Sequence, residues 1–594
     1  MRPRAFLGVE QSLSGRHWVG RETPAEWVEA HRREGVSDLA ARLLAARGAK
    51  PGDGPKILEP RLKDWLPDPS SLQDMDAAID AILEIVARKG TIAILADYDV
   101  DGGTSGALVS RWLRAVGLTP RFYVPDRLTE GYGPSPQAFR RLKSEGADLV
   151  VTVDCGAAAY GPLEEAARIG LDVVVIDHHL MQGAPPPARA VVNPNRPDDT
   201  SGLGSLTAAG VAFVLLVGLN RAARARGFFD ARPVPDLMGW LDLAALGTIC
   251  DVAPLTGLNR AFVAQGLKVL GHKRNVGLTH LATVAGLQEP KSAYHAGFVL
   301  GPRLNAGGRI GDSSLAVRLL STEDPIEAAD LAAQLDLLNI ERRAVEALVL
   351  EEAQILADKA NPDDPCIVVG KPGWHPGVVG IVAGRLKERL HKPAIVLGSA
   401  DLDDALAKGS GRSITGVDLG RAIAACVKDG LLDTGGGHAM AAGMALPFGR
   451  IDAFRKALGE KLRAEADAVT DARDLVFDGA LGLGAASIAT IDEIAKVGPY
   501  GAGWPEPLFA FTDLRVTYAS VAAGSHVRAV LSDNAGAQIR AIAFRAVDTP
   551  LGDALLARNA GPFAIAGKLK RDDWRGGDAV DLTIEDAAFA SESR

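Results

Sequence analysis

Cysteine is scarce in this chain of 594 residues. The four cysteines are widely scattered, without the paired spacing of a disulfide framework or a zinc site; they are Cys155, Cys250, Cys366 and Cys426. Reduced cysteines of this kind are typical of a reducing compartment, so the sequence predicts a cytoplasmic location.

Long apolar runs and a secretory leader are also missing. No apolar stretch reaches the roughly 18 residues needed for a transmembrane helix. Residues 1–18 are interrupted by arginines, polar residues and glycines and lack the apolar core of a signal peptide. The composition, 47% apolar and 23% charged, is ordinary for a soluble protein, and the length suggests three or four domains. We therefore predict no membrane partner.

A positive net charge, the usual footprint of a nucleic-acid-binding protein, is absent as well. The chain has 65 Lys and Arg against 74 Asp and Glu, which gives a net charge of −9. Two bound divalent cations would bring this to about −5. Because local positive stripes decide binding, the net charge neither excludes a nucleic-acid partner nor supports one.

What is present is a series of acidic and histidine motifs behind predicted strands. Apolar runs at 91–96, 149–153 and 173–176 predict the strands. The motifs that follow them are Asp97-Tyr98-Asp99-Val100-Asp101-Gly102, Asp154-Cys155-Gly156 and Asp177-His178-His179. An open α/β sheet gathers the carboxyl ends of its strands at the crevice where ligands bind, so we expect these side chains to meet there.

Carboxylates and imidazoles collected in one crevice would repel one another unless cations neutralised them. The economical interpretation is a site for two divalent metals, which suits an enzyme that hydrolyses a phosphate ester. Asp251 ends a further apolar segment, 241–249, and could complete the set. The alternatives are an Asp/Gly turn for the first motif and a buried, hydrogen-bonded histidine for the third. Two adjacent histidines in register with two acidic strand ends favour metal.

Alternating strand and helix patterns from about residue 71 to 255 predict a parallel sheet, with helices over 104–116 and 162–169. Residues 1–55 are expected to be an N-terminal extension with short helices. A helical pattern at 324–359 has the length of a helix that joins two domains.

A second α/β region follows the long helix, with strands near 366–369 and 394–397. It carries three segments that are interpreted as glycine-marked turns, at 374–377, 409–413 and 435–438. From about residue 469 short strands recur with turn signals, which predicts a small β-barrel.

The acidic and histidine motifs at 97–102, 154–156 and 177–179 resemble those of the DHH phosphoesterase superfamily. Gly436-Gly437-His438 with 439–443 resembles its associated DHHA1 substrate-binding domain. The segments 246–252, 301–309 and 500–507 narrow the resemblance to bacterial single-strand-specific exonucleases. It runs from about residue 60 to 590. Val100 and the segment 206–210 depart from the family pattern, and the second departure is expected to alter helix packing near the site.

The resemblance implies two Mn²⁺ or Mg²⁺ ions and a metal-activated water that attacks in line. The implied ligands or immediate catalytic partners are Asp99, Asp101, Asp154, His178, His179 and Asp251. Among them Asp101, Asp154, His178 and His179 are the expected catalytic residues, and Asp154 is expected to bridge the metals. Asp97 and Asp177 are expected to orient the ligands. Which histidine binds metal and which touches the phosphate stays open.

The resemblance also implies contacts to a DNA strand. Arg127 matches an arginine that faces the 5′ end, and Ser410 and Arg412 match a 5′-end pocket. Arg303 and Arg309 flank Asn305 in what is expected to be a glycine-rich, phosphate-binding loop, and His438 is expected to contact a phosphate near the metals.

Aromatic side chains could stack on bases, and the candidates are Tyr132, Trp374 and Trp504, against the alternative that both tryptophans are packed in the core. The C-terminal barrel resembles an OB-fold. Residues 471–594 contain 12 Lys and Arg against 17 Asp and Glu, so weak DNA binding is expected there. The one local basic cluster comprises Lys568, Lys570, Arg571 and Arg575.

The predicted fold class is α/β, with an OB-fold β-barrel at the end. The predicted domains are an N-terminal extension (1–70), a DHH catalytic domain (71–323), a connecting helix (324–360), a DHHA1 domain (361–468) and the OB-fold (469–594).

The resemblance implies a 5′→3′ exonuclease that releases mononucleotides from single-stranded DNA in repair and recombination. It implies a monomer, with a RecQ-type helicase and a single-strand-binding protein as partners. The rival interpretations are a hydrolase of short oligoribonucleotides or cyclic dinucleotides, which the barrel disfavours, and a degenerate scaffold, which the complete ligand set disfavours.

Overall fold

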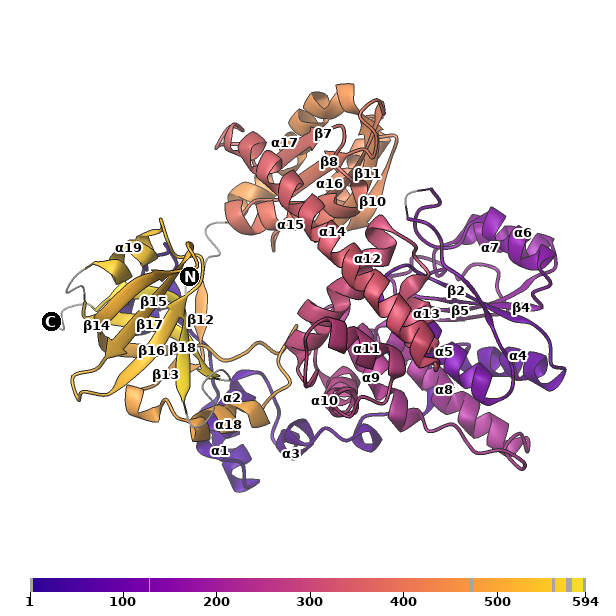
Figure 1. Ribbon diagram of the computed structural model, residues 1–594, viewed down its shortest axis with the longest axis horizontal. Coiled ribbons are helices and arrows are strands. Elements are labelled where there is room, and N and C mark those ends of the chain that lie inside the picture. Colours follow the sequence, from indigo (N-terminus) through magenta and orange to yellow (C-terminus); the bar gives the residue numbers. More distant parts are fainter. Residues whose placement is uncertain (1–3, 128, 470–473, 558–560, 573–578, 591–594) are drawn as a thin grey trace. The chain divides into compact units, whose positions relative to one another are not determined.

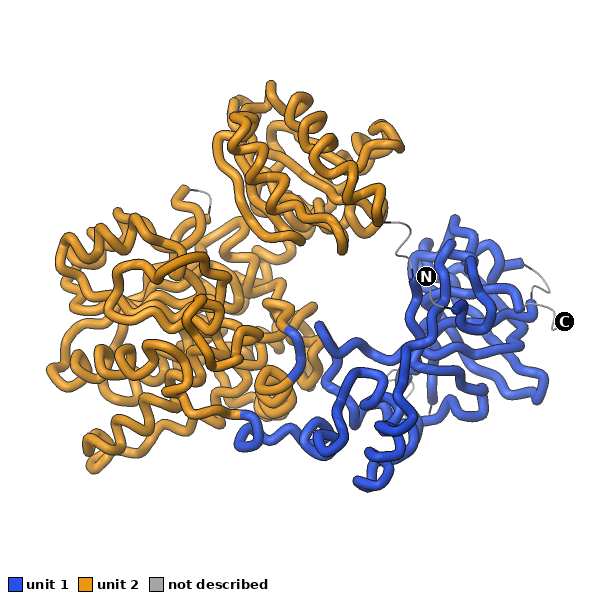
Figure 2. The backbone as a smooth tube through the Cα atoms, turned by 180° about the vertical axis from the view of Figure 1, so that it is seen from behind, with its two compact units in different colours: residues 1–65, 254–256, 471–594 blue, residues 66–253, 257–470 orange. Residues whose placement is uncertain are grey.

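The chain divides into two compact units in the computed structural model (Figures 1 and 2). The structure describes residues 4–127, 129–469, 474–557, 561–572 and 579–590. Unit 1 comprises Met1–Trp65, Pro254–Thr256 and Asp471–Arg594, and unit 2 comprises Leu66–Ala253 and Gly257–Thr470. Each unit has its own hydrophobic core and is described by itself.

The first sheet of unit 2 is parallel and has the strand order β3-β2-β4-β5-β6. Its strands are β2 (Ile92–Ala96), β3 (Arg121–Tyr123), β4 (Leu149–Val153), β5 (Asp172–Ile176) and β6 (Ala190–Val192). The central strands β2 and β4 are buried along their whole length, as expected for uninterrupted apolar runs covered on both faces. Ala96 pairs with Val153, and Val153 with Ile176, so the three predicted strands end side by side.

Helices surround this sheet and extend unit 2 beyond it (Figure 1). They are α4 (Met75–Ala87), α5 (Val100–Ala115), α6 (Pro136–Ser144), α7 (Tyr160–Arg168), α8 (Ala208–Ala225), α9 (Leu241–Cys250), α10 (Gly257–Gly271), α11 (Val276–Val284), α12 (Gly301–Ile310) and α13 (Leu315–Ser321). The helix predicted over 104–116 begins earlier, at Val100, because the carboxylate of Asp99 accepts the backbone N–H groups of Asp101 and Gly102 as an N-cap.

Helix α8 is long and apolar enough to cross a membrane by length and composition alone, with a mean hydropathy of 1.4 over 18 residues. The expectation that no stretch reaches this length is therefore wrong. However, 67% of this window is buried inside the protein, and α8 packs against α4, α5 and α9. It is placed as the core helix of a soluble protein would be.

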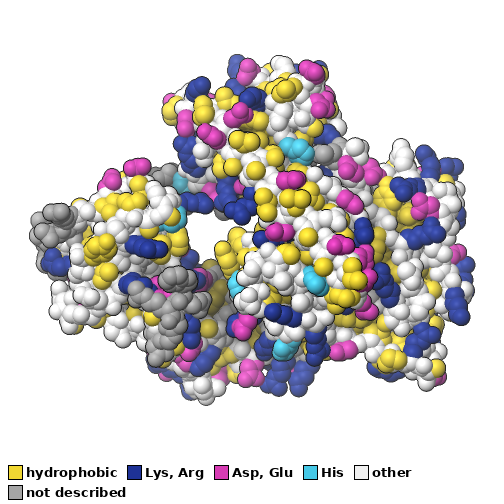
Figure 3. Space-filling view, in the orientation of Figure 1, with side chains coloured by type: hydrophobic (Ala, Val, Ile, Leu, Met, Phe, Trp, Pro, Cys, Tyr) yellow, Lys and Arg dark blue, Asp and Glu magenta, His cyan; other side chains and the backbone are white. Residues whose placement is uncertain are grey.

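A single helix, α14 (Pro325–Asp358), crosses unit 2 and is about 50 Å long at 1.5 Å per residue. The carboxylate of Asp324 caps its first turn by accepting the N–H of Ile326. Leu331 and Leu335 of its first half are buried, and Val349 and Ala353 of its second half join the core beneath the second sheet. Its outward face carries apolar side chains among acidic ones (Figure 3).

The second sheet of unit 2 is mixed, with the order β10-β11-β9-β8-β7. Its elements are β7 (Ile367–Lys371), α15 (Pro376–Leu390), β8 (Ala394–Gly398), β9 (Leu406–Arg412), α16 (Leu419–Lys428), β10 (Thr434–His438), β11 (Ala441–Pro447) and α17 (Ile451–Ala468). Two of the three predicted glycine turns are wrong, because 409–412 lies in β9 and 435–438 in β10. A Cβ at Gly409 would lie 2.4 Å from Leu397, so this glycine permits close packing and marks no turn.

Unit 1 contains a closed five-stranded barrel, in which β14 pairs with both β15 and β17. Its elements are β12 (Leu475–Phe477), β13 (Gly479–Ala480), α18 (Ile488–Lys496), β14 (Phe509–Ala522), β15 (His526–Ser532), β16 (Gln538–Ala543), α19 (Pro550–Leu556), β17 (Phe563–Arg571) and β18 (Val580–Phe589). Closure leaves no open sheet edge between β14 and β17.

The N-terminal residues belong to this same unit. Strand β1 (Trp18–Gly20) pairs in parallel with β12, and α1 (Ala25–Arg33), α2 (Asp38–Ala46) and α3 (Gly54–Leu58) follow it. Trp18 is 0% exposed, and its indole N–H donates to the buried carboxylate of Asp586 in β18 at 3.1 Å. A buried ion pair also joins Arg47 to Asp478 at 2.8 Å. The short helices were predictable, but their union with the barrel was not.

Candidate metal centre

The three motifs meet because their strands end in register. The backbone N–H of Asp97 donates to the carbonyl of Val153, and that of Asp154 donates to the carbonyl of Ile176. Asp177 continues the series by donating to Val192. Three aspartates from three strands therefore stand next to one another at the carboxyl edge of the sheet, where sequence reasoning placed them.

Asp177 supports His179. Its Oδ1 accepts the Nδ1–H of His179 at 2.7 Å, and its Oδ2 accepts the N–H of Ala157 at 2.9 Å. Burial is the largest single influence on Asp177 and would raise its pKa, but the hydrogen bond and charge of His179, the N–H of Ala157 and the charge of His178 together outweigh burial and lower the pKa to about 2. Burial likewise opposes protonation of His179, and the bond to Asp177 raises its pKa to about 9. A histidine held by Nδ1 offers Nε2 to a metal or a phosphate.

His178 stands among three carboxylates. Its Nε2 lies 3.3 Å from Oδ1 of Asp154, 3.8 Å from Oδ2 of Asp101 and 3.9 Å from Oδ2 of Asp251. Its ring also contacts that of His179, with 4.6 Å between centroids. The Asp-His-His motif therefore directs its two imidazoles to neighbouring points of one cluster.

The carboxylate of Asp101 is held by the start of α8. Its Oδ2 accepts the N–H of Ala208 at 2.7 Å, and its Oδ1 accepts the N–H of Ala209 at 3.0 Å. Burial is the largest cause that raises the pKa of Asp101, and the charge of Asp99 adds to it. The segment 206–210 thus supplies two donors through its backbone, while the side chain of Thr207 caps α8 and those of Leu206, Ala208 and Ala209 are buried.

Asp154 and Asp251 complete the carboxylate cluster. Asp154 has a strained backbone, and Asp251 is exposed. Asp154 has φ +61°, a left-handed conformation that a non-glycine residue adopts at a cost. Burial raises the pKa of Asp154 well above its usual range, followed by the charges of Asp99 and Asp101. Partial burial, and then Asp101 and Asp99, raises the pKa of Asp251 to about 8. Because their pKa values are raised, these carboxyl groups would release protons when a cation binds.

The cluster contains three overlapping sets of ligand residues, and within each set the ligand atoms lie within 4.8 Å of one another. They are Asp154 with His178 and His179, Asp101 with His178 and Asp251, and Asp97 with Asp99 and Asp154. Asp154 and His178 each belong to two sets, so the sets adjoin. The Oδ1 of Asp97 is buried and has no hydrogen-bond partner among the described residues, and a cation would satisfy it. Oxygen and imidazole donors in these numbers suit two divalent cations.

Arginines gather beside the cluster within unit 2. Burial, together with Arg127, Arg342 and Arg412, lowers the pKa of Arg309 to about 10. The guanidinium of Arg309 also donates to the carbonyl of Gly377 at the start of α15, at 3.0 Å. The positive charges of these arginines repel one another, and a bound polyanion would relieve that repulsion, so the group forms a site for a polyanion.

Two further predicted phosphate contacts are neighbours on β9. The Nη1 of Arg412 donates to Oγ of Ser410 at 2.8 Å, and α15 packs over both residues at Gly380. Burial and the charge of Arg127 lower the pKa of Arg412, so Ser410 and Arg412 belong with the arginines above.

The predicted loop of Arg303, Asn305 and Arg309 is wrong, because these residues lie on helix α12. A Cβ at Gly308 would lie 2.6 Å from the carbonyl oxygen of Tyr98, so the glycines allow the helix to approach the first motif. At 100° per residue Asn305 and Arg309 share one face and Arg303 faces away. Arg303 donates instead to Asp336 and to the carbonyl of Val299, each at 2.8 Å.

His438 is exposed at the end of β10. Within the described part of the chain no hydrogen bond or ion pair joins it to the carboxylate cluster. Among the stacking candidates, Tyr132 donates its hydroxyl to the carbonyl of Asp154 at 2.8 Å. For the tryptophans the alternative of core packing is confirmed and stacking on bases is not: Trp374 and Trp504 are buried, and their indoles donate to Glu352 and Val497.

Family models match three segments of the chain. They are the DHH family N-terminal domain at 91–248, the DHHA1 domain at 363–464 and the RecJ OB domain at 477–586. The single-stranded-DNA-specific exonuclease RecJ of Dickeya dadantii is 36% identical over 570 residues, which cover 94% of this chain and 97% of that protein. The chain belongs to the RecJ family. RecJ of Escherichia coli is 36% identical and is covered over 95% of its length, with 92% of this chain.

A solved RecJ structure shares the fold as well. RecJ of Thermus thermophilus in complex with Mn²⁺ superimposes with a TM-score of 0.79 at 31% identity, covering 97% of this chain and 80% of that one. A second structure of the same RecJ holds Mg²⁺. The predicted fold class, an α/β body with a C-terminal OB-fold, is confirmed.

Proposed function

We propose that this RecJ-family chain is an exonuclease that hydrolyses single-stranded DNA from the 5′ end to mononucleotides by two-metal-ion catalysis. The observation that supports this most directly is the juxtaposition of the three overlapping ligand sets with a group of arginines. A phosphodiester needs cations at its reacting oxygens and donors for the phosphate at the strand end.

The residues that would hold two Mn²⁺ or Mg²⁺ ions are the six expected from the sequence, Asp99, Asp101, Asp154, His178, His179 and Asp251. Asp97, which was expected only to orient them, lies close enough to Asp99 and Asp154 to join this set. Bound there, the ions would supply an activated water and charge stabilisation at the phosphate. Asp154 is the proposed bridge, because it belongs to two ligand sets. Asp177 keeps His179 oriented, and the amides of Ala208 and Ala209 keep Asp101 oriented.

The arginine group gives the proposed polarity. Arg127, Arg309, Ser410 and Arg412 would hold a terminal 5′ phosphate, and bidentate guanidinium contacts suit a dianionic end better than an internal phosphate. Asn305 shares the face of α12 that carries Arg309 and would contribute an amide donor. His438 remains a proposed phosphate contact, and Arg303, paired with Asp336, is proposed to contact a phosphate through its remaining nitrogen.

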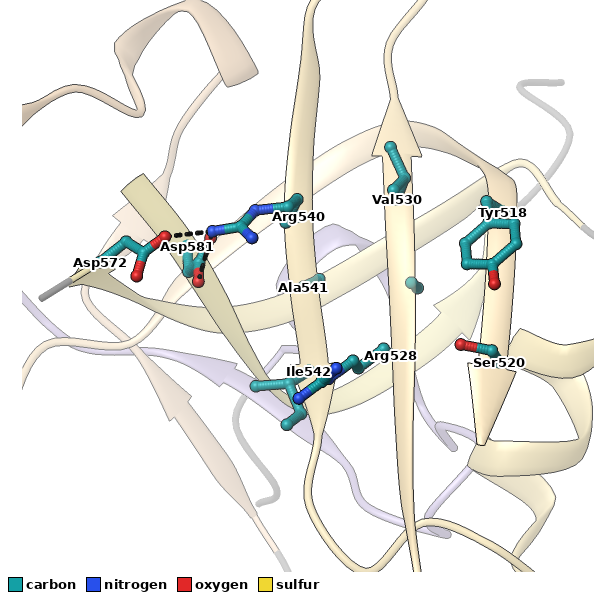
Figure 4. Close-up of a pocket in the computed structure, with 10 residues that line it drawn as sticks. Tyr518, Ser520, Arg528, Val530, Arg540, Ala541, Ile542, Asp572 and Asp581 are labelled. Carbon is teal, nitrogen blue, oxygen red and sulfur yellow. Dashed lines mark hydrogen bonds and ion pairs between the residues drawn. The ribbon is translucent and has the colours of Figure 1, made fainter. Parts of the chain in front are cut away.

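The barrel is proposed to add a weak single-strand surface. Tyr518, Ser520 and Arg528 line a hollow on its outer face together with Arg540, which is ion-paired with Asp572 and Asp581 (Figure 4). The predicted basic cluster is also neutralised, because Lys568, Lys570 and Arg571 pair with Glu585, Glu506 and Asp492. Arg575 lies outside the described residues.

The domain boundaries 1–70, 71–323, 324–360, 361–468 and 469–594 are retained as a proposal. So are a cytoplasmic location, a monomeric state, a role in repair and recombination, and partnership with a RecQ-type helicase and a single-strand-binding protein. A preference for short oligoribonucleotides is the rival function, which the OB domain match disfavours.

The test offers one oligonucleotide, labelled at the 5′ or the 3′ end, as single-stranded DNA, blunt duplex and RNA in Mn²⁺. Immediate release of a labelled mononucleotide from the 5′-labelled single strand, with the duplex spared, supports the proposal. Preference for RNA or for very short oligonucleotides overturns it. Asp101→Ala should abolish release while the circular dichroism spectrum is retained.

A further inference from the structure

Two aromatic rings stand exposed beside the metal centre without a role in the site described above. Tyr294 is 65% exposed and Phe298 is 73% exposed, more than any other aromatic side chain among the described residues. Their rings are stacked, with 5.4 Å between centroids and 21° between planes. The pair therefore offers one continuous aromatic surface to solvent.

The backbone that carries the pair is held rigidly from its other side. The four-residue spacing puts both rings on the same side of a π-helical segment, His295–Leu300, which leads directly into α12. Ala296 and Leu300 of this segment are completely buried. The thiol of Cys250 donates to the carbonyl of Ala296 at 3.7 Å.

That buried side faces the helix that presents a metal ligand. Asp251 directly follows Cys250 at the end of α9, and a Cβ at Gly297 would lie 3.1 Å from the side chain of Ile249. The aromatic pair is thus anchored within a turn of a residue in the proposed ligand set. The arginine group is reached along α12, in which Arg309 lies about 12 Å from Gly301 at 1.5 Å per residue.

The surroundings decide which occupant fits this surface. Between 285 and 303 no other large apolar side chain of the described residues is exposed, and the exposed Val252 and Val284 outside this range are aliphatic, so the aromatic surface is about the size of one or two rings. A patch this small suits a planar base better than a protein surface. Stacking on an aromatic face also holds every base alike, as an exonuclease that removes successive nucleotides requires.

We propose that Tyr294 and Phe298 form a stacking platform for a base of the single strand, a few nucleotides to the 3′ side of the bond that is cut. This inference rests on the proposed function, because it needs a strand whose 5′ end lies at the arginines and whose scissile bond lies at the metals. The platform would hold the part of the strand that has not yet reached the metal centre.

The test compares Tyr294→Leu/Phe298→Leu with Phe589→Leu. The control also removes an exposed ring that stacks on another, since Phe589 is 59% exposed and its ring centroid lies 5.2 Å from that of the buried Phe563. The substrates are 5′-phosphorylated dT30, which reaches the platform, and 5′-phosphorylated dT3, which ends before it. Binding is followed in EDTA with 2-aminopurine placed at successive positions of the longer strand.

The double variant should raise the KM for dT30 relative to that for dT3 about tenfold, as expected for the loss of one stacked base. It should also abolish the 2-aminopurine quenching at one or two adjacent positions, and the control should change neither. An equal change for both substrates would show that the segment only supports Asp251, and no change would leave the platform without a role in DNA binding; either result overturns the proposal. If the wild-type chain releases no mononucleotide, the proposed function fails instead.

Discussion

The imidazole of His179 and the carboxylate of Asp177 form the shortest hydrogen bond of the His179 ring, 2.7 Å from Nδ1 to Oδ1. The second oxygen of Asp177 is occupied by the N–H of Ala157 at 2.9 Å, so the carboxylate cannot turn without losing a partner. The ring of His179 is therefore fixed by a group that is itself fixed by the backbone. Asp177 therefore orients His179, and His179 is a proposed metal ligand.

Asp177→Asn should lower kcat about 10- to 100-fold, the usual effect of losing the group that orients a metal ligand. The asparagine places an NH₂ group against either the N–H of Ala157 or the Nδ1–H of His179, where two donors oppose each other. Steady-state release of mononucleotide in Mn²⁺ measures the effect. Asp172→Asn, on the same strand but paired with Arg189 at the surface, is the control. Activity within twofold of wild type would contradict the assignment.

Addition of Mn²⁺ should stabilise the wild-type chain and affect Asp251→Asn much less. Mass action gives about 4 kcal/mol of stabilisation when the metal is present at 1,000 times its Kd. In EDTA the Asp251→Asn variant should be more stable than the wild-type chain. The asparagine removes one charge from a group of carboxylates whose charges raise the pKa of their neighbours. Thermal unfolding with and without Mn²⁺ gives both comparisons. Equal responses to the metal would exclude Asp251 from the ligand set.

Asp242→Asn should stabilise the chain at pH 8 but not at pH 4. Burial, only partly offset by Arg111, raises the pKa of Asp242 in the folded state from 3.8 to about 6. The folded state then binds more protons than the unfolded state between these values, so stability falls as pH rises through this window. The gain from the neutral amide is on the order of 3 kcal/mol above pH 6. Urea unfolding at the two pH values measures it, and a pH-independent difference would refute the explanation.

Trp18→Phe should destabilise the barrel by about 1 to 3 kcal/mol, because it leaves a buried oxygen of Asp586 without its donor. The ring itself is largely replaced, so the lost hydrogen bond dominates. Tyr518→Phe, at an exposed position of β14, provides the matched control. Denaturant unfolding followed by the near-ultraviolet signal of the barrel is the measurement. A midpoint that moves no further than in the control would show that the indole bond contributes little.

Much of the site was predictable because strand ends in a parallel sheet are brought together by simple geometry. The apolar runs before Asp97, Asp154 and Asp177 contained that information, and the register of β2, β4 and β5 confirms it. Helix α14 was predictable for a similar reason, since its pattern was long and uninterrupted. In both cases the local pattern and the tertiary structure agree.

The wrong turn and loop predictions share one physical cause, which is that glycine was interpreted as a turn former. Gly308 and Gly409 occupy a helix and a strand where another chain segment approaches too closely for a Cβ. Such an approach depends on residues far away in the sequence, so no local pattern reveals it. The same limit concealed the pairing of β1 with β12 and the burial of Trp374.

The bond between Trp18 and Asp586 joins residues 568 positions apart, and it closes the core of one barrel with the first and last segments of the chain. During synthesis at about 5–20 residues per second, Trp18 therefore waits roughly 30 to 110 s for its partner. All of unit 2 emerges from the ribosome in that interval and is able to fold first. The core of this barrel is thus completed only after all of unit 2 has been made.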